Sequence, residues 1–290
     1  MGLGIESYIV QMVHGLVYGM LLFLVASGLT LVFGMMGVLN MAHASFYMLG
    51  AYLAYTITGH LGSFWLSLLI CPILVGLLGI FIERFLLRKA YKGGHISQLL
   101  LTFGLFFIFG ESVRLVWGGA PLSVASPVIL AGDIHVAGMT YPVYRLFILA
   151  FSFLVLIGMV LLLTKTRIGI IIRAAVTDAD MVGVLGSNVP VVLMAVFGAG
   201  AALAAMAGVI AAPFSSMYPG MGADALLDCF VVIVLGGFGS LYGAFLGSLM
   251  IGELQSFGVL WIPRLALVFQ FLLMAAVLIW RPTGLFGEKE

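Results

Sequence analysis

The sequence predicts an all-α integral membrane protein, and three observations carry that prediction. Of its 290 residues, 63% are hydrophobic and only 8% are charged, whereas roughly 25% of the residues in an ordinary soluble domain are charged. Apolar runs long enough to cross a bilayer recur along the whole chain. The sequence lacks the short strands of alternating polarity that a membrane barrel needs. We therefore expect one transmembrane domain over residues 1–290, a helical bundle of about 8–9 spans.

The membrane spans can be placed in chain order from their apolar runs. The N-terminal tail carries no Lys or Arg, so it lacks the basic region of a cleaved signal and should remain as the first span. Pro72 predicts a kink in the third span. The sixth span is rich in Gly and Ala, which lets helix backbones pack closely in a membrane. The expected spans are residues 8–33, 34–58, 64–82, 96–117, 143–164, 191–212, 226–257 and 265–280.

Glycines interrupt the second and the seventh of these apolar segments. An offset of 202 residues aligns the two interruptions with six identities, which indicates a repeated half. Many transporters build a central pathway from glycine-broken helices at matching places in two repeats. Two independent helix kinks are the alternative interpretation. The hypothesis assigns the translocation pathway to Gly34, Gly37, Asn40, His43, Gly236, Gly237 and Gly239.

The basic residues predict the orientation of the chain, because cytoplasmic loops collect Lys and Arg. Nine of the twelve Lys and Arg residues lie in three clusters, at 84–92, 165–173 and 281–289. All three clusters are expected in the cytoplasm. This requires the break near Gly237 to separate two crossings, and it places the N-terminus outside with nine crossings, unless a piece near Gly34 is re-entrant.

The connector at residues 165–190 is the most polar part of the chain. It holds five of the 23 acidic and basic residues, namely Lys165, Arg167, Arg173, Asp178 and Asp180. Thr177 and Asp180 have the spacing of a capping box, and Gly186 suits a left-handed helix end. The expected helix at 178–185 spans about 12 Å, too short to cross a bilayer. We therefore expect it to press against a partner on one face of the membrane.

Several classes of function are disfavoured by the sequence. It contains no P-loop, zinc-protease motif or nucleophile elbow, so a transport protein is expected rather than an enzyme. A net charge of +1 offers no basic field for nucleic acid. Cys71 and Cys229 are expected to pack in apolar segments, and Glu111 and Arg114 to pair locally. Ionisable residues within apolar segments are functional candidates, although interior packing is favoured for each alone: His14, His43, Asp228 and Glu253.

Four stretches together resemble the permease subunits of branched-chain amino acid ABC transporters. The stretches are GLTLVFGMMGVLNMAHASFYMLGAY at 28–52, RAAVTDADMVGVLGSNV at 173–189, VLGGFGSLYGAFLG at 234–247 and RPTGLFG at 281–287. The resemblance runs nearly the full length of the chain. It implies a single permease domain in the bacterial inner membrane, part of an ATP-driven importer for branched-chain or similar hydrophobic amino acids.

The resemblance also implies partners and a coupling site. A second permease chain, two ATPase subunits and a periplasmic binding protein are expected, with ATP and magnesium held by the ATPases and no cofactor in this chain. The connector is then the coupling helix, with coupling residues Arg173, Thr177, Asp178, Asp180, Met181, Leu185 and Gly186. Related permeases for urea, short amides or other amino acids share these motifs. A self-contained small-solute channel and a membrane-bound enzyme are the competing classes.

Overall fold

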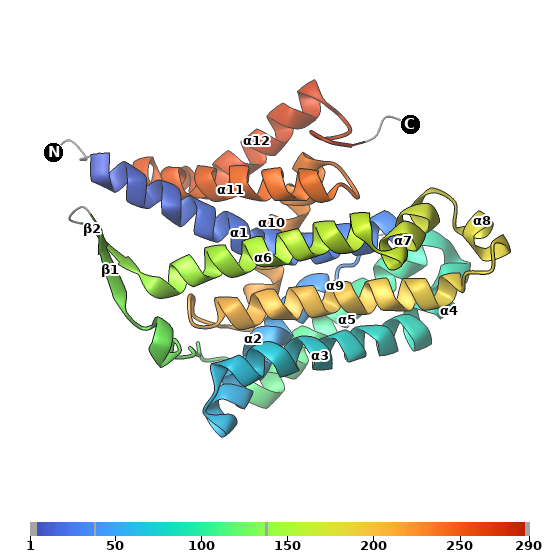
Figure 1. Ribbon diagram of the computed structural model, residues 1–290, viewed down its shortest axis with the longest axis horizontal. Coiled ribbons are helices and arrows are strands. Elements are labelled where there is room, and N and C mark those ends of the chain that lie inside the picture. The colour runs from blue at the N-terminus through green and yellow to red at the C-terminus, as the bar shows by residue number, and fades with distance from the viewer. Residues whose placement is uncertain (1–4, 38, 137–138, 288–290) are drawn as a thin grey trace.

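The computed structural model describes residues 5–37, 39–136 and 139–287, which form a bundle of long helices with a small β-hairpin (Figure 1). The long helices are α1 (Ile5–Met36), α2 (His43–Leu61), α3 (Phe64–Ile82), α5 (Gly94–Trp117), α6 (Val143–Lys165), α7 (Arg167–Thr177), α9 (Val189–Ala211), α10 (Met221–Gly236), α11 (Leu241–Trp261) and α12 (Ala266–Trp280). The short elements are η1 (Glu83–Leu87), α4 (Arg88–Ala90), η2 (Tyr91–Gly93), η3 (Val128–Leu130), α8 (Ala179–Val184), η4 (Pro263–Leu265) and the antiparallel strands β1 (Asp133–Val136) and β2 (Met139–Pro142).

Six helical stretches among the described residues are long and apolar enough to cross a membrane, which confirms the all-α membrane class. One of them, Phe64–Trp117, is 54 residues long and turns back on itself. Ser67 near its start lies 3.0 Å from Thr58 between the two hydroxyl oxygens, and Trp117 at its end donates to Thr56 at 2.8 Å. Both ends therefore meet the last turns of α2, so α3 and α5 run in opposite directions.

The central helix is α9, because its small residues let other backbones approach. A β-carbon on Gly198 would lie 3.0 Å from the carbonyl oxygen of Gly76 in α3, and one on Gly200 would lie 2.9 Å from that of Gly28 in α1. α2 packs against α9 as well. The prediction that Gly and Ala in the sixth span serve close helix packing is confirmed.

The longest interface joins α1 and α11, which run antiparallel. Near the start of α1, the side chain of Gln11 donates to the carbonyl oxygen of Ser256 late in α11. At the other end, a β-carbon on Gly34 would lie 3.6 Å from Cα of Gly239, just before α11 begins. The two helices are therefore in contact near both of their ends.

The helix ends gather at two opposite ends of the bundle (Figure 1). The start of α1 and the β1–β2 hairpin lie at one end, on the left of the view, which we call the hairpin end. α4, α7 and α8 lie at the other, which we call the connector end. Arg88 donates to the carbonyl oxygen of Pro190 at 3.0 Å, so the first basic cluster touches the end of the connector.

Three segments sharpen or correct the expected order of elements. The seventh apolar segment splits near Gly237 into α10 and α11, as predicted. The second span begins at His43 instead of residue 34, because α1 continues unbroken to Met36 and absorbs the start of the glycine-punctuated stretch. The 118–142 loop contains a hairpin that the sequence did not predict.

Candidate functional site

The connector forms two helices where one was expected. α7 begins at Arg167, and Thr166 caps it by accepting a hydrogen bond from the Gly169 N–H at 3.1 Å. α7 buries Ile172 and Ala175. Its opposite side is exposed, as an amphipathic helix at a membrane surface requires.

The predicted capping box in the connector is wrong. Thr177 is the last residue of α7, and its hydroxyl donates to the carbonyl oxygen of Arg173 at 3.3 Å. Asp178 caps α8 instead, because it leaves the helical region of the backbone and its Oδ1 accepts from the Met181 N–H at 2.9 Å. Asp180 lies in the first turn of α8, where a carboxylate favours the helix N-terminus.

The predicted left-handed end of this helix is confirmed at Gly186, whose φ is +89°. The N–H of Ser187 bonds the carbonyl oxygen of Val182 at 3.2 Å, and the N–H of Gly186 bonds that of Gly183 at 3.0 Å. This pair of bonds is a Schellman motif. α8 ends at Val184, one residue before the expected end at Leu185.

α8 exposes apolar side chains at the connector end. Met181, Val184 and Leu185 are 54%, 83% and 77% exposed, whereas Val182 is buried. Fully exposed apolar residues clustered on a polar connector mark an interaction surface. These exposed apolar side chains could contact another protein at the connector end.

Arg88 fixes the neighbouring basic segment to the connector. It donates to the buried carboxylate of Glu83 at 3.3 Å as well as to the Pro190 carbonyl oxygen. Tyr91 donates to the second carboxylate oxygen of Glu83 at 3.1 Å. The η1–η2 turn and the start of α9 are therefore held together by one charge-assisted network.

The structure brings the two glycine breaks into contact at the connector end. Gly34 lies against Gly239, and the rings of Phe33 and Phe238 pack with their centroids 4.7 Å apart. The breaks therefore meet, but they meet by backbone contact. None of the seven predicted pathway residues lines the groove between α6, α7 and α9, the two cavities beside Tyr18, or the hollow beside Arg281.

The second break receives the end of the chain. The N–H groups of Leu285 and Phe286 bond the carbonyl oxygens of Leu235 and Gly236 at 2.9 and 3.0 Å. Gly237 has a φ of +98°, and a β-carbon on it would lie 2.8 Å from the tail backbone. The open backbone at Gly236 and Gly237 thus holds the RPTGLFG motif in place.

The residues after the first break shape the start of α2. Asn40 Oδ1 accepts from the Ala42 N–H at 3.1 Å, and the Asn40 carbonyl oxygen accepts from the His43 N–H at 3.1 Å. His43 is 1% exposed, and its Nε2 lies 3.0 Å from the carbonyl oxygen of Val25. Gly37 has a φ of +64°, which lets the chain leave α1.

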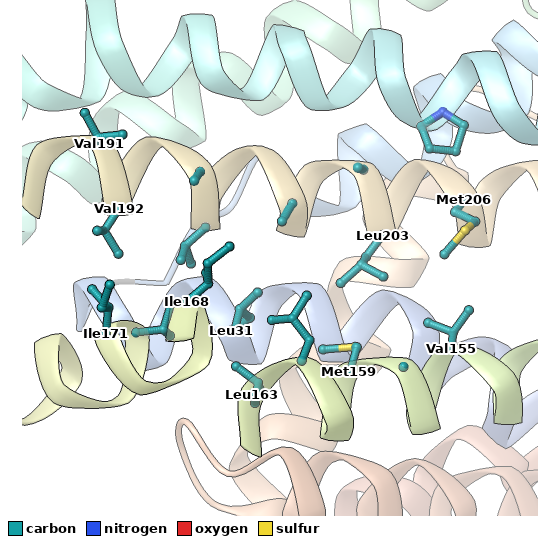
Figure 2. Close-up of a pocket in the computed structure, with 18 residues that line it drawn as sticks. Leu31, Val155, Met159, Leu163, Ile168, Ile171, Val191, Val192, Leu203 and Met206 are labelled. Atoms are coloured by element: carbon teal, nitrogen blue, oxygen red, sulfur yellow. The ribbon is translucent and has the colours of Figure 1, made fainter. Parts of the chain in front are cut away.

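An apolar groove of about 780 Å³ runs between α6, α7 and α9 (Figure 2). Figure 2 shows Val155 and Met159 of α6 facing Leu203 and Met206 of α9 across it. An amino acid carries an ammonium and a carboxylate. The side chains drawn in Figure 2 are apolar and provide no hydrogen-bond or charge partner for either group. The groove suits lipid chains or an apolar helix, and not the solute.

The remaining sequence candidates take local roles or lie near the hairpin end. Glu111 and Arg114 form the predicted exposed pair at 3.2 Å. Cys71 and Cys229 are buried and free. No group of three metal-ligating side chains occurs in the part of the chain that the structure describes. Asp228 accepts hydrogen bonds from Tyr18 and Gln270, neither of which the sequence singled out.

Similarity to known proteins decides the class. Residues 11–278 match the family described as the branched-chain amino acid transport system permease component. This chain belongs to that family. It is a membrane transport permease, and the expectation that it is not an enzyme agrees with its relatives.

The relatives cover nearly the whole chain. The high-affinity branched-chain amino acid permease protein BraD of Pseudomonas aeruginosa is 31% identical over 99% of this chain and 98% of its own length. LivH of Escherichia coli is 29% identical over 98% of this chain and 96% of its own length. A probable LivH of Methanocaldococcus jannaschii is 25% identical over 94% of this chain and 90% of its own length. No solved structure matches the chain.

Proposed function

We propose that this chain is the permease subunit of an ATP-driven importer that carries branched-chain or similar hydrophobic amino acids. The full-length similarity to permeases named for those substrates is the observation that carries the proposal. Permeases for urea, short amides or other amino acids are the second candidate. A self-contained channel is less favoured, because α8 offers an exposed apolar surface that a partner would cover.

The proposed topology has nine crossings of the bacterial inner membrane within one domain, residues 1–290. Support comes from the reversal between α3 and α5 and from the split of α10 and α11 near Gly237. With the basic clusters in the cytoplasm, the connector end is cytoplasmic and the hairpin end is outside. A cysteine at Lys92 or Lys165 should then label only from the cytoplasm, and one at Asp133 only from outside.

The proposed ATPase contact is the connector. α8 would be the coupling helix, with Met181 and Leu185 as its apolar contacts and Asp180 beside them. Asp178, Gly186 and Thr177 would act by shaping the helix and its two ends, and Arg173 by placing charge on α7. A second permease chain and a binding protein would complete the importer, and ATP with magnesium would bind the ATPases alone.

The glycine breaks are proposed as the cytoplasmic closure of the pathway. The backbone contact between Gly34 and Gly239 supports a closed end that must part for the solute to leave. Gly37, Asn40 and His43 shape the same corner. Gly236 and Gly237 hold the tail against it, so we assign them a structural part in this closure.

The proposed function is tested by purification and transport together. An ATPase chain should copurify with this permease from its native membrane, and the purified assembly in liposomes should import L-leucine only with ATP and a binding protein. Uptake of L-leucine by this chain alone would favour the channel. Uptake of urea in place of L-leucine would favour the second candidate.

A further inference from the structure

Two adjoining cavities lie in the half of the bundle toward the hairpin end. Their volumes are about 190 and 220 Å³, and the side chains of Tyr18 and Phe214 line both. We call the two together the Tyr18 cavity. Sites for drug-sized ligands usually measure about 300–1,000 Å³, so cavities of this size suit a smaller solute.

Asp228 supplies a negative charge in the first cavity. Tyr18 Oη donates to its Oδ2 at 2.6 Å, and Gln270 Nε2 donates to its Oδ1 at 3.2 Å. Both donors are neutral. A carboxylate has about four acceptor positions, so two remain for another donor.

Arg145 supplies a positive charge in the second cavity. Its guanidinium bonds Nε2 of His14 and lies 5.9 and 5.4 Å from the ring centres of Tyr141 and Phe214. All of these neighbours are uncharged acceptors or ring faces. The guanidinium has five N–H donors, and His14 is the hydrogen-bond partner found for it among the described residues.

Neither charge has an opposite charge beside it in the described residues. The ion pairs found there, within 4.0 Å, are Glu83–Arg88 and Glu111–Arg114. An ionisable group within an apolar segment is costly and normally pairs, so Asp228 in α10 indicates a missing partner. Arg145, in the first turn of α6, is an opposite charge in the adjoining cavity. One molecule that carries both charges would satisfy both groups.

Building on the proposed importer function, we propose that the Tyr18 cavity binds the zwitterion of an aliphatic amino acid. Arg145 receives the carboxylate and Asp228 receives the ammonium. The aliphatic side chain packs on Leu21, Leu22, Val25 and Met221, which line the Asp228 cavity. This site lies in the opposite half of the bundle from the glycine breaks and shares no residue with them.

The two charges are both bonded to side chains of α1. Tyr18, which bonds Asp228, and His14, which bonds Arg145, are four residues apart and so share one face of α1. The charges are therefore offset along α1 instead of touching.

A second acid, Asp224, also lines the first cavity and already accepts a hydrogen bond. Tyr218 donates a hydrogen bond to Asp224, and this bond raises the pKa of Tyr218 to about 12, so the phenol stays a donor at neutral pH. Asp224 is exposed, whereas Asp228 is half-buried. The ammonium is therefore assigned to Asp228, where fewer waters compete.

The test removes each charge from the solute and from the protein in turn. Binding of L-leucine, L-leucinamide and 4-methylpentanoate to the purified assembly, without its binding protein, is measured by calorimetry. The amide lacks the carboxylate and the acid lacks the ammonium. The wild type should bind L-leucine about tenfold more tightly than either analogue, the loss expected for one charge-assisted contact.

Each variant should erase one preference and keep the other. Arg145→Gln should bind L-leucine and L-leucinamide equally, and Asp228→Asn should bind L-leucine and 4-methylpentanoate equally. Arg114→Gln and Glu111→Gln make the same changes in an exposed pair and should retain both preferences. A merely structural role for either residue would weaken all three ligands together.

Two results would overturn the site, and they are distinct from failure of the importer. Equal binding of the three ligands by the wild type does so even when a variant cannot be purified. Unchanged ligand preferences in both variants do so as well. If the wild-type assembly imports no L-leucine at all, the proposed function itself fails; if it imports L-leucine but lacks these preferences, only the Tyr18 cavity is rejected.

Discussion

The two halves of α1 lie in opposite surroundings. Toward the hairpin end, His14 and Tyr18 line cavities whose guanidinium and carboxylate, from Arg145 and Asp228, have no opposite charge within 4.0 Å among the described residues. Toward the connector end, Gly28 packs on α9 and Gly34 packs on the start of α11, backbone against backbone. One half offers space and charge to a solute, and the other is closed. In the proposed orientation, the cavities lie toward the outside and the backbone contact lies toward the cytoplasm.

A helix pair connects the open half to the closed half. α1 and α11 touch near both ends, at Gln11 with Ser256 and at Gly34 with Gly239. α7 also contacts α1. Packed helices therefore join the connector to the proposed closure.

The largest expected effect comes from locking the closed half. Cysteines at Gly34 and Gly239, in a chain with Cys71→Ala and Cys229→Ala, lie close enough to form a disulfide. Oxidation should reduce L-leucine uptake to background while the assembly stays intact, because the closure can no longer part. Uptake in liposomes is compared before oxidation, after it and after reduction. Full uptake by a chain shown to be cross-linked would place the exit elsewhere.

A similarly large effect is expected at the exposed surface of α8. Met181→Asp together with Leu185→Asp places charge on a surface proposed to be buried by the ATPase. ATPase copurification and L-leucine uptake should both fall at least about tenfold, since an unpaired charge in an interface costs several kcal/mol. Val128→Asp, at a 93% exposed apolar position in the loop after α5, is the matched control for copurification. Unchanged copurification in the α8 variant would remove the connector from the interface.

The sequence predicted the membrane class and several helix ends better than it predicted the residues of a solute site. The membrane class, the split near Gly237, the meeting of the two breaks and the left-handed Gly186 follow from composition, charge clusters and glycine chemistry. These are local or whole-chain signals. The sequence assigned the translocation pathway to the breaks, which stays a prediction, and in this structure Gly34 and Gly239 of the two breaks touch by backbone.

The Tyr18 cavity was missed for a physical reason. Asp228 was noted as an ionisable residue in an apolar segment, but its partners lie 210 and 42 residues away, in α1 and α12. Arg145 stands at the start of an apolar run, where a basic residue is ordinary. Only the helix packing places these groups around one space, and no spacing in the sequence encodes that.

A moderate effect is expected at Asp178, the observed N-cap of α8, and not at Thr177, the N-cap that the sequence predicted. Asp178→Ala removes the side-chain bond to the Met181 N–H and should destabilise this turn by about 1 kcal/mol. Coupled uptake should fall a few-fold. Thr177→Ala loses only a bond to its own helix, at Arg173, and uptake should stay near wild type. The reverse order of effects would restore the capping box that the sequence predicted.

The smallest expected effect distinguishes the two acids of the Tyr18 cavity. Asp224 is exposed and holds Tyr218, whereas Asp228 is half-buried and held by Tyr18 and Gln270. Water screens an exposed charge, so Asp224→Asn should change L-leucine binding less than about twofold. The same substitution at Asp228 removes a charge from a drier place and should cost about tenfold. Calorimetry on both variants under identical conditions decides between them. If Asp224→Asn weakens L-leucine and spares 4-methylpentanoate, the ammonium sits at the rim, and the open half of α1 receives its solute nearer the hairpin end than Asp228 allows.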